Sequence, residues 1–451
     1  MNMPALPRRR LLQSALAMSA LSPVGEALAR VVGARRAGDG YGPLRPVPDA
    51  NTGLPLLQLP EGFSYRSFAW AGELLADGSR MPGAADGMGI ARADGEVFTL
   101  VRNHEVMGPT PFGPAASHYD PACGGGTVTL RYDRRQGKLA EARGSLSGTL
   151  VNCAGGITPW GSWLSCEEIV TPVGHSGQFG GKPFRLEHAH GFVFEVPADG
   201  VSSAKALTSL GQFKHEAALV DPRDGVVYLT EDHRPAGFYR LLPTRKGDLA
   251  AGGRLQMLRA KGASDLRRGL KPGQRFDIDW VDIEQPAQGF VGGAVDGVQR
   301  QGLVQGASRF TRLEGLIAGD DEIFFNSTDG GDAQAGQVWR LIPSRQQLEL
   351  FFESPGAHVL DYPDNVTLAP GGGLLICEDS KQPVQRLWWM GRDGQLAELA
   401  RNNTVLDGEH LGIKGDFRNT EWAGACFSAD GKTLFANIYR PGYTVAISGP
   451  F

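Results

Sequence analysis

A two-strand unit with polar residues at both ends recurs along this chain of 451 residues, and it limits the possible folds more than any other feature. In the clearest copy, residues 152–168, apolar residues alternate on either side of a turn at 159–161, between Cys153 near the start and Glu168 at the end. Alternation around a Pro/Gly breaker predicts two short antiparallel strands. Similar units begin at Asp86, Glu216, Glu314, Asp364 and Glu421.

The spacing inside these units brings their polar ends together. In three of them the first and last polar residues lie fifteen positions apart, from Cys153 to Glu168, Glu216 to Glu231 and Glu314 to Asp329. Two strands of about six residues and a turn fill that interval, so both ends meet at one edge of a small sheet. We therefore expect polar side chains to gather on one side of the fold.

Six similar β units indicate an all-β fold, specifically a six-bladed β-propeller. The 63 glycines and 29 prolines agree with many short strands joined by turns. The strand-like segments 62–70 and 444–447 flank the six units, and we expect them to share one sheet and close the ring. The long insertion between Thr244 and Gly306 either caps the channel mouth or lengthens a blade, and the sequence leaves both open.

The N-terminus has the pattern of an export signal. Residues 8–10 are three consecutive arginines, 14–21 are mildly apolar, and 27–29 form an A-x-A cleavage site. We interpret residues 1–29 as a twin-arginine signal, which predicts passage through the twin-arginine translocon to the periplasm or outside. Residues 30–55 are expected to form a linker or N-terminal wrap, and residues 56–451 the propeller domain.

The residues that open the six units would form a ring, because the innermost strand of each blade lines the central channel. The candidates are Asp86, Cys153, Glu216, Glu314, Asn365 and Glu421. A mostly acidic ring repels itself unless cations are bound. Carboxylate and amide oxygens suit calcium, whereas the sulfur of Cys153 favours a transition metal such as iron or zinc beside it. A metal cluster at the mouth of the central channel follows.

Arg312 lies two residues before Glu314, so both side chains point to the same side of a strand. A guanidinium beside a cationic cluster suits a bound phosphate group, which it can contact through two N–H groups. The alternative is an ion pair with a ring carboxylate. The spacing alone does not separate these two interpretations.

Several motifs in order resemble those of the PhoX alkaline phosphatase family: NCAGGITPWGSWLSCEE, HEAALVDPRDGVVYLTED, RLEG followed by STDGG, PDNVTLAPGGGLLICED and EWAGACFSADGKTLF. The resemblance runs from about Asp86 to Ile447. It implies an exported phosphomonoesterase with iron (Fe³⁺) and calcium (Ca²⁺). By motif, Cys153, Glu216 and Glu314 would hold the cluster and Arg312 the substrate phosphate, and calcium would be bound by Asn152, Glu168, Asp364, Glu378 and Glu421.

The expected partner is a small phosphoester bound by a monomer. A formal charge of −4 and the lack of a Lys/Arg block beyond the N-terminus argue against nucleic acid. Two other functions remain open: a calcium-dependent propeller lactonase or esterase, which gives Cys153 no role, and a calcium-stabilised binding propeller without catalysis.

Overall fold

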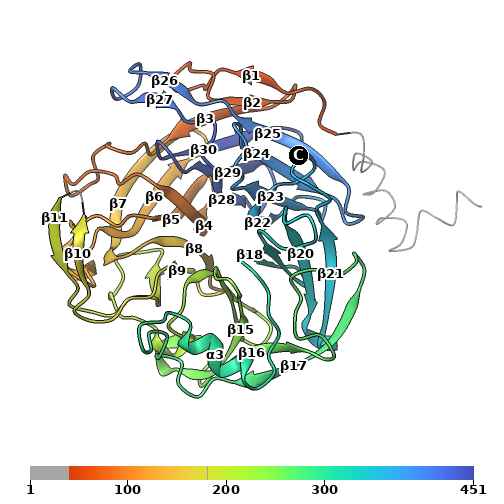
Figure 1. The fold of residues 1–451 in the computed structure, drawn as a ribbon. Helices are drawn as coiled ribbons and strands as arrows, with labels where there is room; N and C mark the ends of the chain where they lie inside the picture. Colours follow the sequence, from red (N-terminus) through yellow and green to blue (C-terminus); the bar gives the residue numbers. More distant parts are fainter. Residues whose placement is uncertain (1–39, 180) are drawn as a thin grey trace, which may run out of the picture.

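A computed structural model describes residues 40–179 and 181–451 and shows an all-β, propeller-like arrangement (Figure 1). The predicted export signal and residues 30–39 of the predicted linker lie outside the described residues. Helices in the described part are short: α3 (Gly297–Leu303) and the 3-10 turns Ala115–Ser117, Thr208–Leu210, Leu249–Ala251 and Pro343–Arg345.

The strands form five main antiparallel sheets. One contains, in order, β4 (Ala85–Asp94), β5 (Val97–His104), β6 (Gly125–Asp133) and β7 (Lys138–Thr149). The next has the order β12 (Val193–Pro197), β9 (Ser162–Glu167) and β8 (Asn152–Ile157). A third has the order β28 (Trp422–Phe427), β29 (Thr433–Ile438), β30 (Tyr443–Ser448) and β3 (Ser64–Phe68).

Two sheets are larger. A nine-stranded sheet has the order β13 (His215–Val220), β14 (Val227–Glu231), β15 (Phe238–Pro243), β16 (Gly253–Ala260), β17 (Arg275–Asp282), β21 (Gln347–Glu353), β20 (Gln337–Ile342), β19 (Ile323–Ser327) and β18 (Leu313–Ala318). A six-stranded sheet has the order β1 (Arg45–Val47), β2 (Leu57–Leu59), β25 (Leu396–Asn402), β24 (Arg386–Met390), β23 (Leu374–Glu378) and β22 (Pro363–Leu368). Two hairpins complete the fold, β10 (Ser176–Phe179) with β11 (Lys182–Arg185) and β26 (Val405–Asp407) with β27 (Lys414–Asp416).

The strands β4, β8, β13, β18, β22 and β28 contact one another in succession, and β28 returns to β4. Together they surround the centre of the molecule (Figure 1). Residues from all six line a central cavity of about 370 Å³, largely with small and aliphatic side chains. Each of these inner strands is the first strand of one predicted two-strand unit.

The predicted hairpins are present, and each contains an irregularity that the sequence did not reveal. In all six inner strands the register shifts shortly after the strand begins, for example between His215 and Ala218 in β13 and between Leu313 and Leu316 in β18. A bulge leaves residues out of the ladder and re-aims their side chains. In β4, β8, β13, β18 and β22 the bulge contains the residue predicted to face the cluster.

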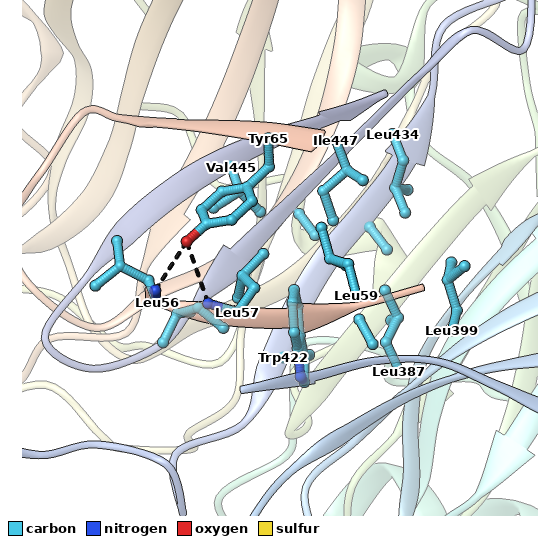
Figure 2. Packing of buried hydrophobic residues seen from close by; sticks show 14 of the residues in the cluster. Leu56, Leu57, Leu59, Tyr65, Leu387, Leu399, Trp422, Leu434, Val445 and Ile447 are labelled. Carbon is cyan, nitrogen blue, oxygen red and sulfur yellow. Dashed lines mark hydrogen bonds between the residues drawn. The ribbon is translucent and has the colours of Figure 1, made fainter. Parts of the chain in front are cut away.

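The predicted closure of the ring is confirmed, because β3 pairs with β30 from Ser64 opposite Ser448 to Phe68 opposite Thr444. A buried cluster fastens this sheet to the next one (Figure 2). The Tyr65 hydroxyl accepts hydrogen bonds from the backbone N–H groups of Leu56 (2.8 Å) and Leu57 (3.2 Å). Burying each large side chain of such a cluster contributes about 1.5–3 kcal/mol. The chain just before β3 is thereby fixed to the domain.

The long insertion lengthens a sheet. Its strands β16 and β17 extend the β13–β15 sheet outward, and β17 then pairs with β21 of the sheet that ends in β18. This pairing joins two sheets into one of nine strands at the periphery of the molecule (Figure 1).

Candidate functional site

Five buried polar side chains lie one position beyond the first paired residue of an inner strand. They are Asp86, Cys153, Glu216, Glu314 and Asp364. Four of the residues that follow them are small, Gly87, Ala154, Ala217 and Gly315, which allows the inner strands to approach closely. A Cβ atom on Gly315 would lie 2.6 Å from the carbonyl oxygen of Asp364, and one on Gly87 would lie 2.5 Å from Cα of Ala154. Close approach of the strands forces the five polar groups together.

The closing ends of the hairpins add a second set of acids. The N–H groups of Glu105, Glu168, Asp232 and Asp379 donate to the carbonyl of the residue just before an inner strand, at 2.9 to 3.1 Å. Successive strand residues point to opposite faces. The residues that precede these acids, His104, Glu167, Glu231 and Glu378, accordingly make their contacts within the sheets.

The acids of both sets form interlocking groups. Within each group, one ligand atom from every residue lies within 4.8 Å of the others. The groups are Cys153, Glu168 and Glu216; Glu216, Glu314 and Asp364; Asp364, Asp379 and Glu421; and Asp86, Glu105 and Glu421. Shared members make them one continuous cluster. A thiol–carboxylate contact of 3.5 Å, from Cys153 Sγ to Asp86 Oδ2, links the ends of the series.

Burial and mutual repulsion strongly disfavour the charged forms of this cluster. Burial, followed by the charges of Glu314 and other neighbouring carboxylates, raises the pKa of Glu216 well above its usual value. The same two causes raise the pKa of Asp86 and of Glu421. Burial and the nearby charge of Asp379 raise the pKa of Asp364 to about 7. A group of like charges in this environment is stable when ionised only if cations neutralise it.

The donor set fits bound metal ions. Both carboxylate oxygens of Glu216 are buried and have no hydrogen-bond partner among the described residues. A buried carboxylate without a partner costs considerable free energy, unless it coordinates a cation. Carboxylate oxygens suit hard cations such as calcium, and the single sulfur, Cys153, suits a transition metal.

Arg312 lies inside the cluster and forms two ion pairs. Its Nε lies 2.9 Å from Oδ1 of Asp232, and one terminal nitrogen lies 2.7 Å from Oε1 of Glu314. Burial opposes the charge of the guanidinium, but Glu314 and Asp232 outweigh it and raise the pKa of Arg312. The ion pair that the sequence offered as one interpretation of Arg312 is therefore present.

The backbone just before four of the six inner strands has the same left-handed conformation. Arg312 has a left-handed conformation, with φ of 40°, and Ala84, Val151 and Tyr362 adopt it at the matching positions of β4, β8 and β22. The carbonyl oxygen of Arg312 accepts a hydrogen bond from the N–H group of Thr328. The carbonyl oxygen of Glu421 accepts the equivalent hydrogen bond from the N–H group of Tyr439. Glu421 thus enters the cluster from the position that corresponds to Arg312, rather than from the position of Glu314.

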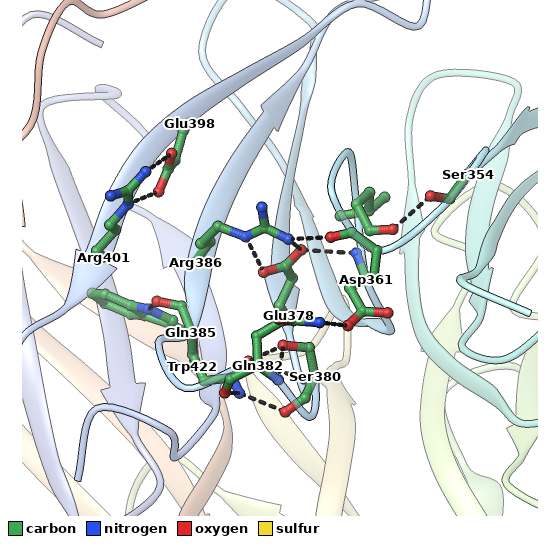
Figure 3. A network of polar contacts seen from close by, with 12 residues as sticks. Ser354, Asp361, Glu378, Ser380, Gln382, Gln385, Arg386, Glu398, Arg401 and Trp422 are labelled. Atoms are coloured by element: carbon green, nitrogen blue, oxygen red, sulfur yellow. Dashed lines mark hydrogen bonds and ion pairs between the residues drawn. The ribbon is translucent and has the colours of Figure 1, made fainter. Parts of the chain in front are cut away.

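Two predicted metal ligands are not brought into these groups. Asn152 donates its amide to Ser165 Oγ (2.8 Å) and accepts from the Thr149 hydroxyl (2.6 Å), because it precedes the bulge and points into the sheet. Glu378 pairs with Arg386 through both carboxylate oxygens, each at 2.8 Å (Figure 3). Its neighbour Asp379 lies in the cluster instead. Glu105, which lies beside Asp86 and Glu421, and Asp232, which pairs with Arg312, were not among the predicted site residues.

The fold and this cluster define a class of protein: a propeller-like β protein whose inner strands carry a buried acidic site suited to metal ions. A family model described as alkaline phosphatase PhoX matches residues 39–442. The chain belongs to the alkaline phosphatase PhoX family and is a phosphoester hydrolase. No helix of the described residues is long and apolar enough to cross a membrane.

Solved structures of similar fold include Pseudomonas fluorescens PhoX in complex with vanadate, a transition state analogue. It is 17% identical, with a TM-score of 0.65, and the match covers 91% of this chain and 98% of that chain. A gluconolactonase from Xanthomonas campestris is 13% identical, with a TM-score of 0.44 and coverage of 92% and 99%, and this likeness is too low to support an inference. No match was found among curated proteins.

Proposed function

We propose that the protein is an exported phosphomonoesterase that binds the phosphate group of its substrate at the acidic cluster, with calcium and iron as cofactors. The observation that carries this proposal is the buried carboxylate of Glu216, which has no hydrogen-bond partner in the described part of the chain and lies within two of the acidic groups. The PhoX family supplies the reaction, and the vanadate complex of the P. fluorescens protein supports phosphate binding in this fold.

The architecture is inferred to be a six-bladed propeller with the cluster at one mouth of its channel. Six inner strands surround the central cavity, and the nine-stranded sheet corresponds to two blades joined by β17 and β21. The cluster residues precede the cavity-lining residues in the inner strands, which supports a position at one end of the channel. Glu105 also borders a second cavity of about 550 Å³ with Phe179, Tyr439 and Arg440, which offers a path for the substrate.

The types of ligand in each group indicate which metal each group would bind. Cys153, with Glu168 and Glu216, would hold the iron, since its sulfur is the one soft donor of the cluster. The oxygen-only groups around Glu314, Asp364 and Glu421 would hold calcium. The bound cations supply charge that offsets the negative charge of the phosphoryl group in the transition state.

Arg312 is proposed to hold the substrate phosphate. Asp232 and Glu314 fix the guanidinium from two sides, so its orientation is set before the substrate arrives. A phosphate oxygen placed beside the remaining N–H groups would receive charge-assisted hydrogen bonds. Glu314 thereby has two tasks, since it orients Arg312 and belongs to a metal group.

The test is made on protein that has been exported through its own signal. Its metal content is measured by elemental analysis, and its hydrolysis of a chromogenic phosphomonoester is measured before and after calcium chelation. We expect calcium and iron in the protein and loss of turnover on chelation. Arg312→Ala should raise KM and lower kcat, by about 10²–10³-fold in kcat/KM, with the metal content retained. Arg300→Ala, at an exposed arginine on α3, is the matched control.

Other results would contradict the proposal. Hydrolysis of a lactone without phosphatase activity, unchanged by Cys153→Ser, would indicate a calcium-dependent lactonase. Calcium-dependent stability without turnover of any ester would indicate a binding propeller. Unchanged kinetics of Arg312→Ala would remove Arg312 from the phosphate site.

Export and assembly remain predictions. The twin-arginine pattern of residues 8–10 predicts a periplasmic or secreted monomer, and its residues lie outside the described part of the chain. Replacement of Arg8 and Arg9 by lysine should retain the protein in the cytoplasm, and fractionation of cells measures this directly.

A further inference from the structure

A second group of metal-ligand side chains lies apart from the phosphatase cluster. Asp120 and Cys123 come from the segment between β5 and β6, and His190 comes from the segment between β11 and β12. All three side chains are fully buried. His190 Nε2 lies 3.6 Å from Cys123 Sγ and 3.5 Å from Asp120 Oδ2.

These distances match the edges of a metal tetrahedron. With zinc–sulfur bonds of about 2.3 Å and zinc–nitrogen and zinc–oxygen bonds of about 2.0–2.2 Å, tetrahedral angles place sulfur about 3.6 Å and oxygen about 3.4 Å from the nitrogen. The two distances from His190 thus already fit one ion, to which the three side chains would supply three of the four ligands of a tetrahedral site. Thiolate, imidazole and carboxylate together favour zinc over calcium, because calcium prefers an all-oxygen set.

Contacts around the three residues orient them for this role. Oε1 of Glu167 lies 2.6 Å from Nδ1 of His190, and because a carboxylate only accepts, the proton is on Nδ1. Nε2 is then the nitrogen that faces Cys123 and Asp120, and it would bind the ion as a neutral imidazole. A carboxylate behind a ligating histidine is a recurring feature of zinc sites. The carboxylate of Asp120 is itself fixed by the N–H groups of Ala122, Glu187 and His188.

The same contacts also have the outline of a Cys–His–Glu catalytic triad, but the burial argues against catalysis. Cys123, His190 and Glu167 are each 0% exposed, so no substrate reaches the thiol. Leu150, Val151 and Leu186 pack around Cys123 in an apolar shell. A metal ion held here would be shut off from substrate, as in structural rather than catalytic sites.

We propose that Asp120, Cys123 and His190 bind one structural zinc ion, distinct from the phosphatase cluster. The ion would fasten the segment that carries the β10–β11 hairpin, because His190 closes this segment by pairing with Thr171. Phe179, at the end of β10, lines the cavity beside Glu105. The zinc site would thus hold in place one wall of the route to the acidic cluster.

The test is elemental analysis of the full protein purified without chelators. We expect one zinc per chain in addition to the metals of the cluster, and loss of that equivalent in Cys123→Ser and His190→Gln. Cys377→Ser, at a buried cysteine in another sheet, is the matched control and should retain it. Zinc-free wild-type protein, or zinc retained by both variants, would overturn the proposal.

Cobalt substitution gives a second measurement that does not depend on phosphatase activity. Cobalt in this site should give near-ultraviolet thiolate-to-metal absorption that persists in Cys153→Ser. Adding Cys123→Ser to that variant should abolish it. Absorption that is lost in Cys153→Ser and kept in Cys123→Ser would contradict the site. If either cysteine variant fails to fold, a third measurement replaces it: zinc is added to chelated wild-type protein and to chelated Asp120→Asn, and the melting temperature of each is recorded. A rise in melting temperature in wild type alone supports the site. An equal rise in both proteins contradicts it.

Discussion

Glu167 and Glu168 are neighbours at the end of β9, yet their carboxylates belong to different structures. Glu167 is fully buried and accepts hydrogen bonds from the backbone N–H groups of Leu150, Gly191 and Phe192. Glu168 faces the acidic cluster with Cys153 and Glu216. One carboxylate holds loops together, and its neighbour adds to a repulsive charge. Substitutions at the two positions should therefore have opposite consequences for stability.

Glu167→Gln should lower the free energy of unfolding by about 3 kcal/mol or more, because its NH₂ group would face buried N–H donors. Glu168→Gln should leave the stability of the metal-free protein unchanged or higher, since it removes a like charge, and it should weaken calcium binding. Urea denaturation after chelation and calcium titration measure the two effects. Equal loss of stability in both variants would contradict the division of roles.

Glu378→Gln should destabilise the protein by about 3–5 kcal/mol, because it leaves Arg386 without its charged partner in a buried ion pair. Asp379→Asn, one residue later, should instead reduce the calcium content and leave the stability of the metal-free protein nearly unchanged. Denaturation curves and elemental analysis of both variants provide the check. A loss of calcium in Glu378→Gln at wild-type stability would return Glu378 to the metal site.

Gly315→Ala should disrupt the cluster without altering any polar side chain. The added Cβ would lie 2.6 Å from both the carbonyl oxygen of Asp364 and the N–H nitrogen of Val366, so β18 and β22 must separate. Stability and calcium affinity should fall together. Gly319→Ala is the control, because its Cβ would meet only the flexible side chain of Glu322. Wild-type calcium affinity in Gly315→Ala would show that the close approach of these strands is not required.

Tyr132 should make stability depend on pH in alkali. Burial is the main cause that raises its pKa from 10.0 to about 12, so the unfolded chain releases this proton before the folded protein does. The stabilisation from the neutral phenol is complete below pH 10 and is lost as pH rises toward 12. The stability of wild type relative to Tyr132→Phe should fall by about 1.4 kcal/mol per pH unit in this window. A difference that stays constant from pH 8 to pH 12 would contradict it.

The sequence was sufficient for the hairpins, because alternation and turn residues repeat in every unit. It also placed Asp86, Cys153, Glu216 and Glu314 among the residues that face the cluster, since each opens a hairpin. In the fifth unit the ring candidate was Asn365, but its neighbour Asp364, which only the family resemblance had indicated, faces the cluster instead. Which of the other polar residues face the cluster depends on the strand register. In the pairs Glu167-Glu168 and Glu378-Asp379 only the second residue faces the cluster, and either choice satisfies the spacing.

A comparison between units could have resolved this ambiguity. The second residue of the closing pair is acidic in four units, at Glu105, Glu168, Asp232 and Asp379, whereas the first is His104 in one of them. Asn152 precedes the bulge and Cys153 lies within it, a distinction that depends on backbone pairing rather than composition. The group of Asp120, Cys123 and His190 could not be predicted, because 67 positions separate Cys123 from His190 and no repeat connects them.

The pairing of β3 with β30 also sets an order of events during synthesis. The first inner strand, β4, cannot be held against the last, β28, until the ribosome has made the chain through Ser448. Asp86 and Glu105 lie on the first side of that junction, and Glu421 lies on the other. The complete cluster therefore cannot form before Glu421 has been synthesised, and we expect its full set of metals to be loaded late in synthesis or after it.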